Sequence, residues 1–381
     1  MKTILISPDS FKGSLTAQDA AAAIERGVRE VLPDSVVIQH PISDGGEGLV
    51  NILTTAYQGT IATTEVQGPL PGQRVKARWG LSQDRSTAII EMAEAAGLGL
   101  VPADKRDPKI TTTYGIGQLI RAALDEGASS LVIGIGGSAT NDGGAGMAEA
   151  LGVRFLDQNG IALARGGAAL AKLSRIDVQR KDPRLSAIEA IVASDVQNTL
   201  CGEEGASLVF GPQKGATAAD VKILDSALLH YGEVIRSALG IDVLRVPGSG
   251  AAGGLGAGLV AFCGAKLQRG IDVVLGATKF DEHLRSVDLV ITGEGRIDEQ
   301  VRFGKALSGV IERANRAGVP VLAIVGSLKG DRSAFINPEF LVDLESLVDS
   351  HTTSQMAMRD ASALLSKKAG VLLRRYLNSA H

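Results

Sequence analysis

A glycine-rich segment at residues 131–147, LVIGIGGSATNDGGAGM, constrains the fold of this chain more than any other stretch. It begins as an apolar, β-branched run, which predicts a buried strand, and then changes abruptly to glycines and short polar residues: Ser138, Thr140, Asn141 and Asp142. Glycine suits a loop that approaches a ligand closely, and successive backbone N–H groups in such a loop bind anions. The segment therefore predicts a phosphate-binding loop. A structural turn is the alternative, although such turns need only a few residues.

Composition excludes several classes of function. With 381 residues, 45% of them apolar, the chain is long enough for more than one domain. A formal charge of -3 and 3% aromatic residues provide neither a basic surface nor a stacking platform, so we expect no nucleic-acid partner. No apolar stretch reaches the roughly 20 residues that a membrane span needs. Two cysteines and an N-terminus without a signal-peptide core favour a cytoplasmic protein.

Carboxylates follow several predicted strands. They are Asp9, Asp44 with Glu47, Asp142, Asp195, and Glu294 with Asp298. Because ligands of open α/β sheets bind beyond the carboxyl ends of parallel strands, we expect these acids to line one cleft. Acids alone would repel a phosphorylated ligand, so the pattern calls for Mg²⁺ and for a cation beside the transferred group. The candidate cations are Lys12, Lys214, Arg296 and Lys305. For residues 43–48, a solvated acidic turn before a helix is the alternative.

The pattern changes between residues 59 and 99, where apolar and polar residues alternate between short turns. This alternation predicts antiparallel strands in an inserted domain, with Trp79 packed inside it. Helical spacing returns at residues 111–123, just before the central strand. A second glycine-rich passage, at residues 247–256, fits a ligand-binding helix start and a helix packed closely through small residues about equally well.

Standard nucleotide motifs leave one alternative open. The chain has no GxxxxGK[ST] sequence, which excludes a Walker-type site. Gly134–Ala139 matches a dinucleotide fingerprint loosely, with Asp157 after a later strand, so an NAD-dependent oxidoreductase is the second reading. In that fingerprint the helix begins at the glycines, whereas here the loop continues to residue 144. The histidines show neither metal spacing nor a catalytic triad pattern.

Several motifs together resemble the type 1 glycerate kinase family of bacteria. They are SPDSFKGSLTA near the start, SDGGEG at 43–48, GIGGSATNDGGAGM at 134–147, ASDV at 193–196, PGSGAAGGLG at 247–256 and TGEGRID at 292–298. The resemblance covers essentially the whole chain. It implies ATP- and Mg²⁺-dependent phosphorylation of (R)-glycerate, a small-molecule substrate, in the breakdown of glyoxylate, glucarate or galactarate. The expected product is 2-phosphoglycerate, with 3-phosphorylation as the alternative.

The resemblance also implies a two-domain α/β architecture. A flavodoxin-like (Rossmann-like) domain with a parallel sheet is expected at residues 1–58, 107–150 and 284–381. A second α/β domain is expected to be inserted at residues 59–106 and 151–283, with the active site in the cleft between the two domains. We expect a monomer or homodimer.

Roles in the expected reaction follow from side-chain chemistry. ATP phosphates are assigned to the glycine loop through Gly136, Gly137, Ser138, Asn141, Gly143 and Gly144. Lys12 is expected to neutralise the transferred phosphoryl group, Asp195 to orient or deprotonate the glycerate hydroxyl, and Arg296 to clamp the glycerate carboxylate. Mg²⁺ is assigned to pairs of carboxylates: Asp44 with Glu47, or Asp195 with Asp298.

Overall fold

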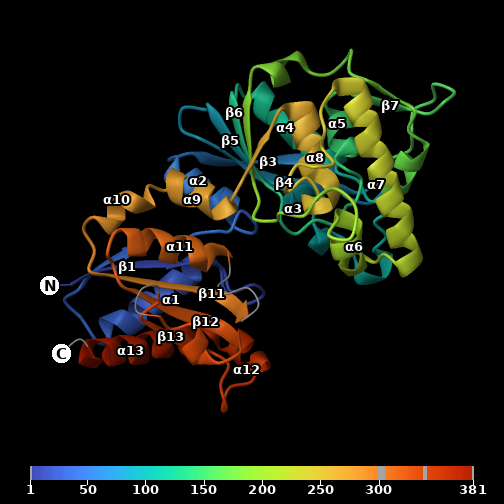
Figure 1. The fold of residues 1–381 in the computed structure, drawn as a ribbon. Helices are drawn as coiled ribbons and strands as arrows, with labels where there is room; N and C mark the ends of the chain where they lie inside the picture. Colours follow the sequence, from blue (N-terminus) through green and yellow to red (C-terminus); the bar gives the residue numbers. More distant parts are fainter. Residues whose placement is uncertain (1, 299–304, 338–340, 380–381) are drawn as a thin grey trace. The chain divides into compact units, whose positions relative to one another are not determined.

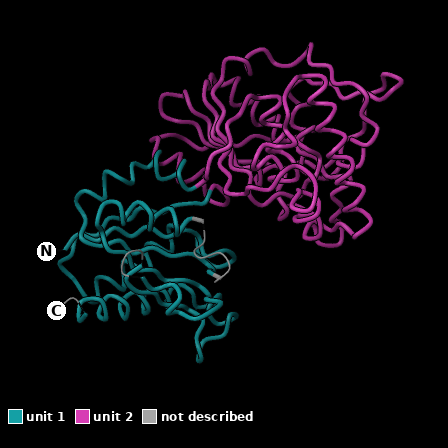
Figure 2. Tube along the Cα trace, viewed as in Figure 1, with its two compact units in different colours: residues 1–44, 271–381 teal, residues 45–270 magenta. Residues whose placement is uncertain are grey.

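The computed structural model describes residues 2–298, 305–337 and 341–379, and its chain divides into two compact units (Figure 2). Unit 1 comprises residues 1–44 and 271–381, and unit 2 comprises residues 45–270. The division differs from the predicted boundaries. Residues 45–58 and 107–150, expected in the flavodoxin-like domain, belong to unit 2, and residues 271–283 belong to unit 1. The reason is that the glycine-rich segment starts from β6 (Ser130–Gly134), which pairs on both sides with strands of unit 2.

In the described part of unit 1, five parallel strands form the sheet, in the order β13-β12-β11-β1-β2. Their bounds are β1 Thr3–Pro8, β2 Val36–Gln39, β11 Leu289–Asp298, β12 Val321–Lys329 and β13 Asp343–Ser346. Counted along the unit, this is the flavodoxin-like strand order, in which the order reverses beside the first strand. The predicted α/β fold class is confirmed.

Helices cover both faces of the sheet of unit 1 (Figure 1). Its helices are α1 Ala17–Arg29, α9 Gly270–Ala277, α10 Phe280–Leu284, α11 Lys305–Arg316, α12 Ser354–Arg359 and α13 Ala361–Ser379. The α1 and α13 helices share a core with the sheet and pack so closely that a Cβ on Gly27 would lie 2.0 Å from the Ser366 carbonyl oxygen. Thr16 caps α1, because its hydroxyl accepts a hydrogen bond from the Asp19 N–H at 3.1 Å.

Unit 2 contains a six-stranded sheet in the order β10-β9-β6-β5-β4-β3. The other strands of this sheet are β3 Thr60–Gln67, β4 Arg74–Leu81, β5 Thr87–Glu91, β9 Glu189–Ala193 and β10 Lys266–Gln268. The β3 and β4 strands are antiparallel, as the alternation predicted, whereas β5, β6, β9 and β10 run parallel. Trp79 is buried as expected, and its indole N–H donates to the Thr64 hydroxyl at 3.0 Å.

The helices of unit 2 contribute to two hydrophobic cores, one against this sheet and one around Phe155, Tyr231 and Phe262. They are α2 Leu49–Ala56, α3 Ala93–Ala96, α4 Tyr114–Asp125, α5 Ala145–Ala150, α6 Ala206–Phe210, α7 Ala218–Leu239 and α8 Ala251–Cys263. A small hairpin of β7 (Arg154–Leu156) and β8 (Arg175–Asp177) adds Phe155 to the aromatic cluster of Tyr231 and Phe262. Within the described ranges, no helix is long and apolar enough to cross a membrane.

Glu91 holds the beginning of α2 in place from the end of β5. Its carboxylate is buried, and Oε1 accepts a hydrogen bond from the Val50 N–H at 2.7 Å. Burial disfavours the ionised form and raises the pKa of Glu91 to about 7, although the hydrogen bond from Val50 opposes the shift.

The substitution Glu91→Gln should change how stability depends on pH. The folded-state pKa of about 7 exceeds the ordinary value of 4.5, so the folded protein holds this proton more tightly than the unfolded chain. The free energy of unfolding of the wild type should therefore decrease as pH rises from about 4.5 to about 7. The glutamine variant has no proton to lose there, so its decrease should be smaller by about 2 to 3 kcal/mol. Urea unfolding at pH 5 and pH 8 measures the difference. If the free energies of unfolding of wild type and variant differ by the same amount at both pH values, the raised pKa of Glu91 does not contribute to stability as described.

Candidate active site

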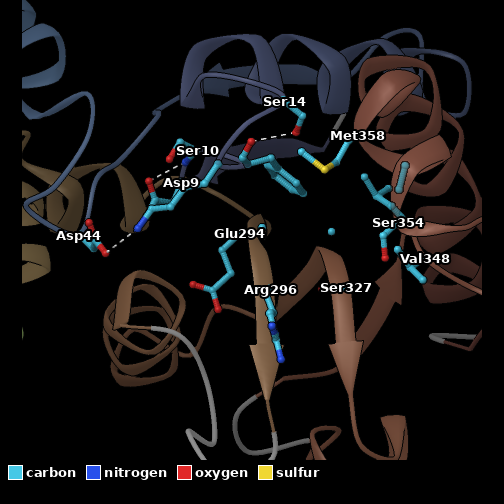
Figure 3. Close-up of a pocket in the computed structure, with 16 residues that line it drawn as sticks. Asp9, Ser10, Ser14, Asp44, Glu294, Arg296, Ser327, Val348, Ser354 and Met358 are labelled. Carbon is cyan, nitrogen blue, oxygen red and sulfur yellow. Dashed lines mark hydrogen bonds and ion pairs between the residues drawn. The ribbon is translucent and has the colours of Figure 1, made fainter. Parts of the chain in front are cut away.

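A cavity of about 390 Å³ lies at the carboxyl ends of β1, β11 and β12 in unit 1 (Figure 3). Three segments form most of it: the loop after β1, the end of β11 and the residues that follow β13. The β1 strand lies between β11 and β2, so the cavity lies where the strand order reverses. In flavodoxin-like sheets this position is the usual ligand site.

One end of the cavity is acidic. Asp9 is 5% exposed, and its Oδ1 accepts a hydrogen bond from the Ser10 N–H at 2.6 Å. Burial, together with the nearby negative charge of Asp44, raises the pKa of Asp9 to about 7. The Lys12 ammonium lies 3.9 Å from Asp44 Oδ2, with 67% of its side chain exposed. Two neighbouring carboxylates beside an exposed cation make this end suited to a positively charged or metal-bound group.

The structure thus brings together three of the residues predicted from the sequence, namely Lys12, Asp44 and Arg296. Asp298 ends β11, but its side chain lies outside the described residues. Asp9 and Glu294 also line the cavity, although no role was assigned to either of them. The signal for both was present, because each lies at the end of a predicted strand.

The other side of the cavity is apolar. It is formed by Phe11, Leu347, Val348, Ala357 and Met358. The first two are almost completely buried, whereas Met358 on α12 is 53% exposed. Hydroxyl groups of Ser14, Ser327 and Ser354 lie among them, and Ser14 donates to the Phe11 carbonyl at 2.8 Å. The cavity therefore offers contacts of opposite chemical character at its two ends.

In unit 2, the predicted phosphate loop is divided between surface and interior. Gly136 and Gly137 are exposed, and Ser138 is nearly buried beside them. Asn141 is fully buried, and its Nδ2 donates to the Ser207 hydroxyl at 2.9 Å. A Cβ on Gly143 would lie 2.5 Å from Tyr231 Cε1. The inner positions pack against other parts of unit 2, so residues 136–138 are the part of the loop that a phosphate can reach.

The second glycine-rich passage explains part of this burial. The Gly143 N–H donates to the Gly253 carbonyl at 3.0 Å, and a Cβ on Gly253 would lie 2.0 Å from the Thr140 carbonyl oxygen. The two glycine-rich segments therefore pack directly on each other at the start of α8. Of the two interpretations of residues 247–256, close packing through small residues is the one that these contacts support.

Asp142 and Lys214 support the loop from inside. Asp142 accepts hydrogen bonds from the backbone and hydroxyl of Thr113 at 2.8 and 3.0 Å, and from the Gly144 and Gly146 N–H groups. The Lys214 ammonium is buried and donates to the Thr140 carbonyl at 2.7 Å. Burial lowers the pKa of Lys214 to about 7, partly opposed by the charge of Asp142. Both side chains stabilise the turn rather than face solvent.

Asp195 and Glu47 also belong to unit 2. Asp195 follows β9, is half-buried, and its Oδ1 accepts a hydrogen bond from the Gly270 N–H at 2.9 Å. Glu47 is exposed in the loop before α2. The α5 helix begins only at Ala145, so no helix starts at Gly134–Ala139. The dinucleotide alternative therefore lacks the helix N-terminus that binds a pyrophosphate.

The acidic end of the cavity suits Mg²⁺ in one particular way. Among the described residues, no three histidine, cysteine or carboxylate side chains lie close enough to hold a metal ion by themselves. Mg²⁺ is usually bound through one or two carboxylates together with substrate phosphates, not by a complete protein cage. Asp44 and Glu294 supply oxygen ligands of this kind at the cavity. The donor set therefore fits a metal ion that arrives with its phosphate.

Comparison with known proteins decides the family. The model of the glycerate kinase family matches residues 4–377. The chain belongs to this family. It is 51% identical to the glycerate kinase of Halalkalibacterium halodurans over 97% of each chain, and 52% identical to the glycerate 2-kinase of Escherichia coli over 86% of each. The crystal structure of a protein assigned as glycerate kinase 2 from Salmonella typhimurium LT2 matches with a TM-score of 0.86 and 47% identity, covering 100% of both chains.

A pair of substitutions tests the division of the glycine loop in this member of the glycerate kinase family. Gly137→Ala and Gly143→Ala both place alanine at positive φ, which costs roughly 1 to 2 kcal/mol. Only Gly143→Ala also forces a Cβ into Tyr231, because the nearest atom to a Cβ on Gly137 is 3.6 Å away. We expect Gly143→Ala to lose about 1 to 3 kcal/mol more in urea unfolding. Equal losses would show that residue 143 is not packed inside unit 2.

Proposed function

We propose that the chain transfers the γ-phosphoryl group of ATP to the 2-hydroxyl of (R)-glycerate in a reaction that requires Mg²⁺. The lining of the cavity carries this proposal, because it combines a metal-binding carboxylate, Asp44, with two cations, Lys12 and Arg296. Phosphoryl transfer requires this combination, since catalysis depends mainly on positioning and on neutralising charge. The relative from Escherichia coli, named glycerate 2-kinase, supports the choice of hydroxyl.

Lys12 is proposed to neutralise the transferred phosphoryl group. Its ammonium lies on a long, largely exposed side chain, and its contact with Asp44 at 3.9 Å is too loose to fix it. Arg296 is proposed to clamp the glycerate carboxylate, because the planar guanidinium presents paired donors that match a carboxylate. When bound, Mg²⁺ would supply charge neutralisation between the phosphates and Asp44, which is its proposed ligand.

Three further roles are proposed from unit 2. Asp195 accepts the proton of the glycerate hydroxyl, and its hydrogen bond from the Gly270 N–H fixes the direction of the carboxylate. The backbone at Gly136 and Gly137, with Ser138, donates to phosphate oxygens. Glu47 is proposed as a further metal ligand, and the metal role of Asp298 stays a prediction for a side chain outside the described residues.

Product analysis tests both the reaction and its position. Incubation with ATP, Mg²⁺ and D-glycerate should release ADP. In the proton-coupled ³¹P spectrum, phosphate on the 2-hydroxyl couples to the single proton of its carbon and gives a doublet. Phosphate on the 3-hydroxyl couples to a methylene pair and gives a triplet. We expect the doublet. A triplet would move the reaction to the 3-hydroxyl, and the absence of ADP release would reject the kinase.

Two substitutions test the proposed roles of Lys12 and Asp195. Lys12→Ala should lower kcat about 10² to 10³-fold, because a charge that stabilises the transition state is lost. Asp195→Asn keeps an oxygen that can accept from Gly270 but cannot take a proton, so kcat should fall about 10² to 10⁴-fold. Lys367→Ala, on the exposed side of α13 and away from the cavity, is the control and should leave kcat unchanged. A kcat of Asp195→Asn within a few-fold of the wild-type value would reject Asp195 as the group that accepts the proton.

A further inference from the structure

The cavity of unit 1 has a polar and an apolar side, and the two sides face each other. In Figure 3, Asp9, Asp44 and Glu294 lie on one side, and Val348, Ser354 and Met358 lie on the other. Arg296 and Ser327 lie between them, at the ends of β11 and β12. A ligand that fills this cavity must therefore carry charge at one end and apolar surface at the other.

Glycerate does not match this description. It is a three-carbon acid with a polar group on every carbon, so it presents no face that would gain from contact with the accessible apolar side chains, Val348 and Met358. Clefts of roughly 300–1,000 Å³ are typical of larger ligands that bury most of their surface against apolar side chains. The volume of about 390 Å³ falls within this range. The size and the apolar lining thus point to the larger of the two substrates.

Met358 is the part of the apolar side most available to a ligand. It projects from α12 with 53% of its surface exposed, while its Cε lies 3.1 Å from the position of a Cβ on Gly13. The side chain therefore extends over the loop that follows β1 and forms the edge of the cavity. Methionine is unbranched and polarisable, and its thioether makes favourable contacts with aromatic rings. A flat heteroaromatic ring bound there would cover surface that is now exposed to water.

We propose that the apolar side of this cavity, formed by Phe11, Leu347, Val348, Ala357 and Met358, binds the purine base of the nucleotide that donates the phosphoryl group. The proposal rests on the proposed function and assigns the base of its donor to unit 1. The base packs against Met358, the hydroxyls of Ser327 and Ser354 lie within the same lining to bind ring nitrogens or ribose, and the phosphates extend toward Lys12. The carboxylates at the far end then meet the phosphates together with their metal ion.

Two methionines on one helix provide a matched test. Met358 lines the cavity and Met356 does not, although both project from α12, with 53% and 40% of their surfaces exposed. Met358→Gln and Met356→Gln replace an apolar chain by a polar one of similar length, and neither should disturb the core. Isothermal titration with ADP, and separately with inorganic tripolyphosphate, separates contacts to the base from contacts to the phosphates.

We expect Met358→Gln to weaken ADP binding about fivefold or more, while Met356→Gln stays within twofold of wild type. Tripolyphosphate, which lacks a base, should bind all three proteins equally. Unchanged ADP binding in Met358→Gln would overturn the proposal, whether or not the KM for glycerate rises. Thermal unfolding without ligand confirms that the variants fold.

The same titration separates this inference from the proposed function. ADP binding that depends on Met358, in a chain that does not phosphorylate glycerate, would support the base site and reject the proposed reaction. Glycerate phosphorylation with ADP binding that is indifferent to Met358 would support the reaction and reject the base site.

Discussion

The parallel pairing of β1 with β11 is the interaction on which the candidate site depends. Its register places Pro8 opposite Gly293, and the Asp9 N–H continues the ladder by donating to the Gly293 carbonyl at 2.8 Å. This bond fixes Asp9 beside Glu294 where the two strands end. Side chains alternate along a strand, so a slip of one residue would turn Asp9 to the opposite face. The acidic end of the cavity thus depends on backbone hydrogen bonds that carry no charge.

Two buried aspartates show how surroundings decide what a carboxylate does. Asp142 accepts hydrogen bonds from both groups of Thr113 and from the N–H groups of Gly144 and Gly146, and these donors offset part of the burial that raises its pKa. Asp9 instead accepts from the Ser10 N–H and lies near the like charge of Asp44, at the wall of a cavity. The first carboxylate stabilises a turn. The second is held at an energetic cost that a cation or a proton would relieve, which is typical of ligand-binding positions.

Much of the local structure was predictable from the sequence, because strands, helices and caps depend on nearby residues. The antiparallel strands after residue 59 and the buried Trp79 follow from the alternation of apolar and polar residues alone. The domain boundaries were not predictable in this way. Whether the segment at residues 130–134 belongs to one sheet or the other depends on which strands lie beside it, and strand partners far apart in the chain leave no local signal. Likewise, glycines that contact a ligand and glycines that contact another backbone look alike in a sequence. Gly143 proved to be of the second kind, because its N–H donates to the Gly253 carbonyl, and a Cβ there would also meet the Tyr231 ring.

The insertion of unit 2 within unit 1 also has a consequence for how the chain folds as it is synthesised. Unit 2 is one uninterrupted stretch, whereas β1 must wait for β11, its neighbour in the sheet, and the contact between Thr3 and Asp288 spans 285 residues. Domains generally fold as units, and those nearer the N-terminus fold first during synthesis. Here unit 1 cannot be completed until all of unit 2 has been synthesised. All of unit 2 is synthesised while the apolar strand Thr3–Pro8 has β2 available on one side but still lacks β11 on the other, so this strand is completed late although it precedes unit 2 in the chain.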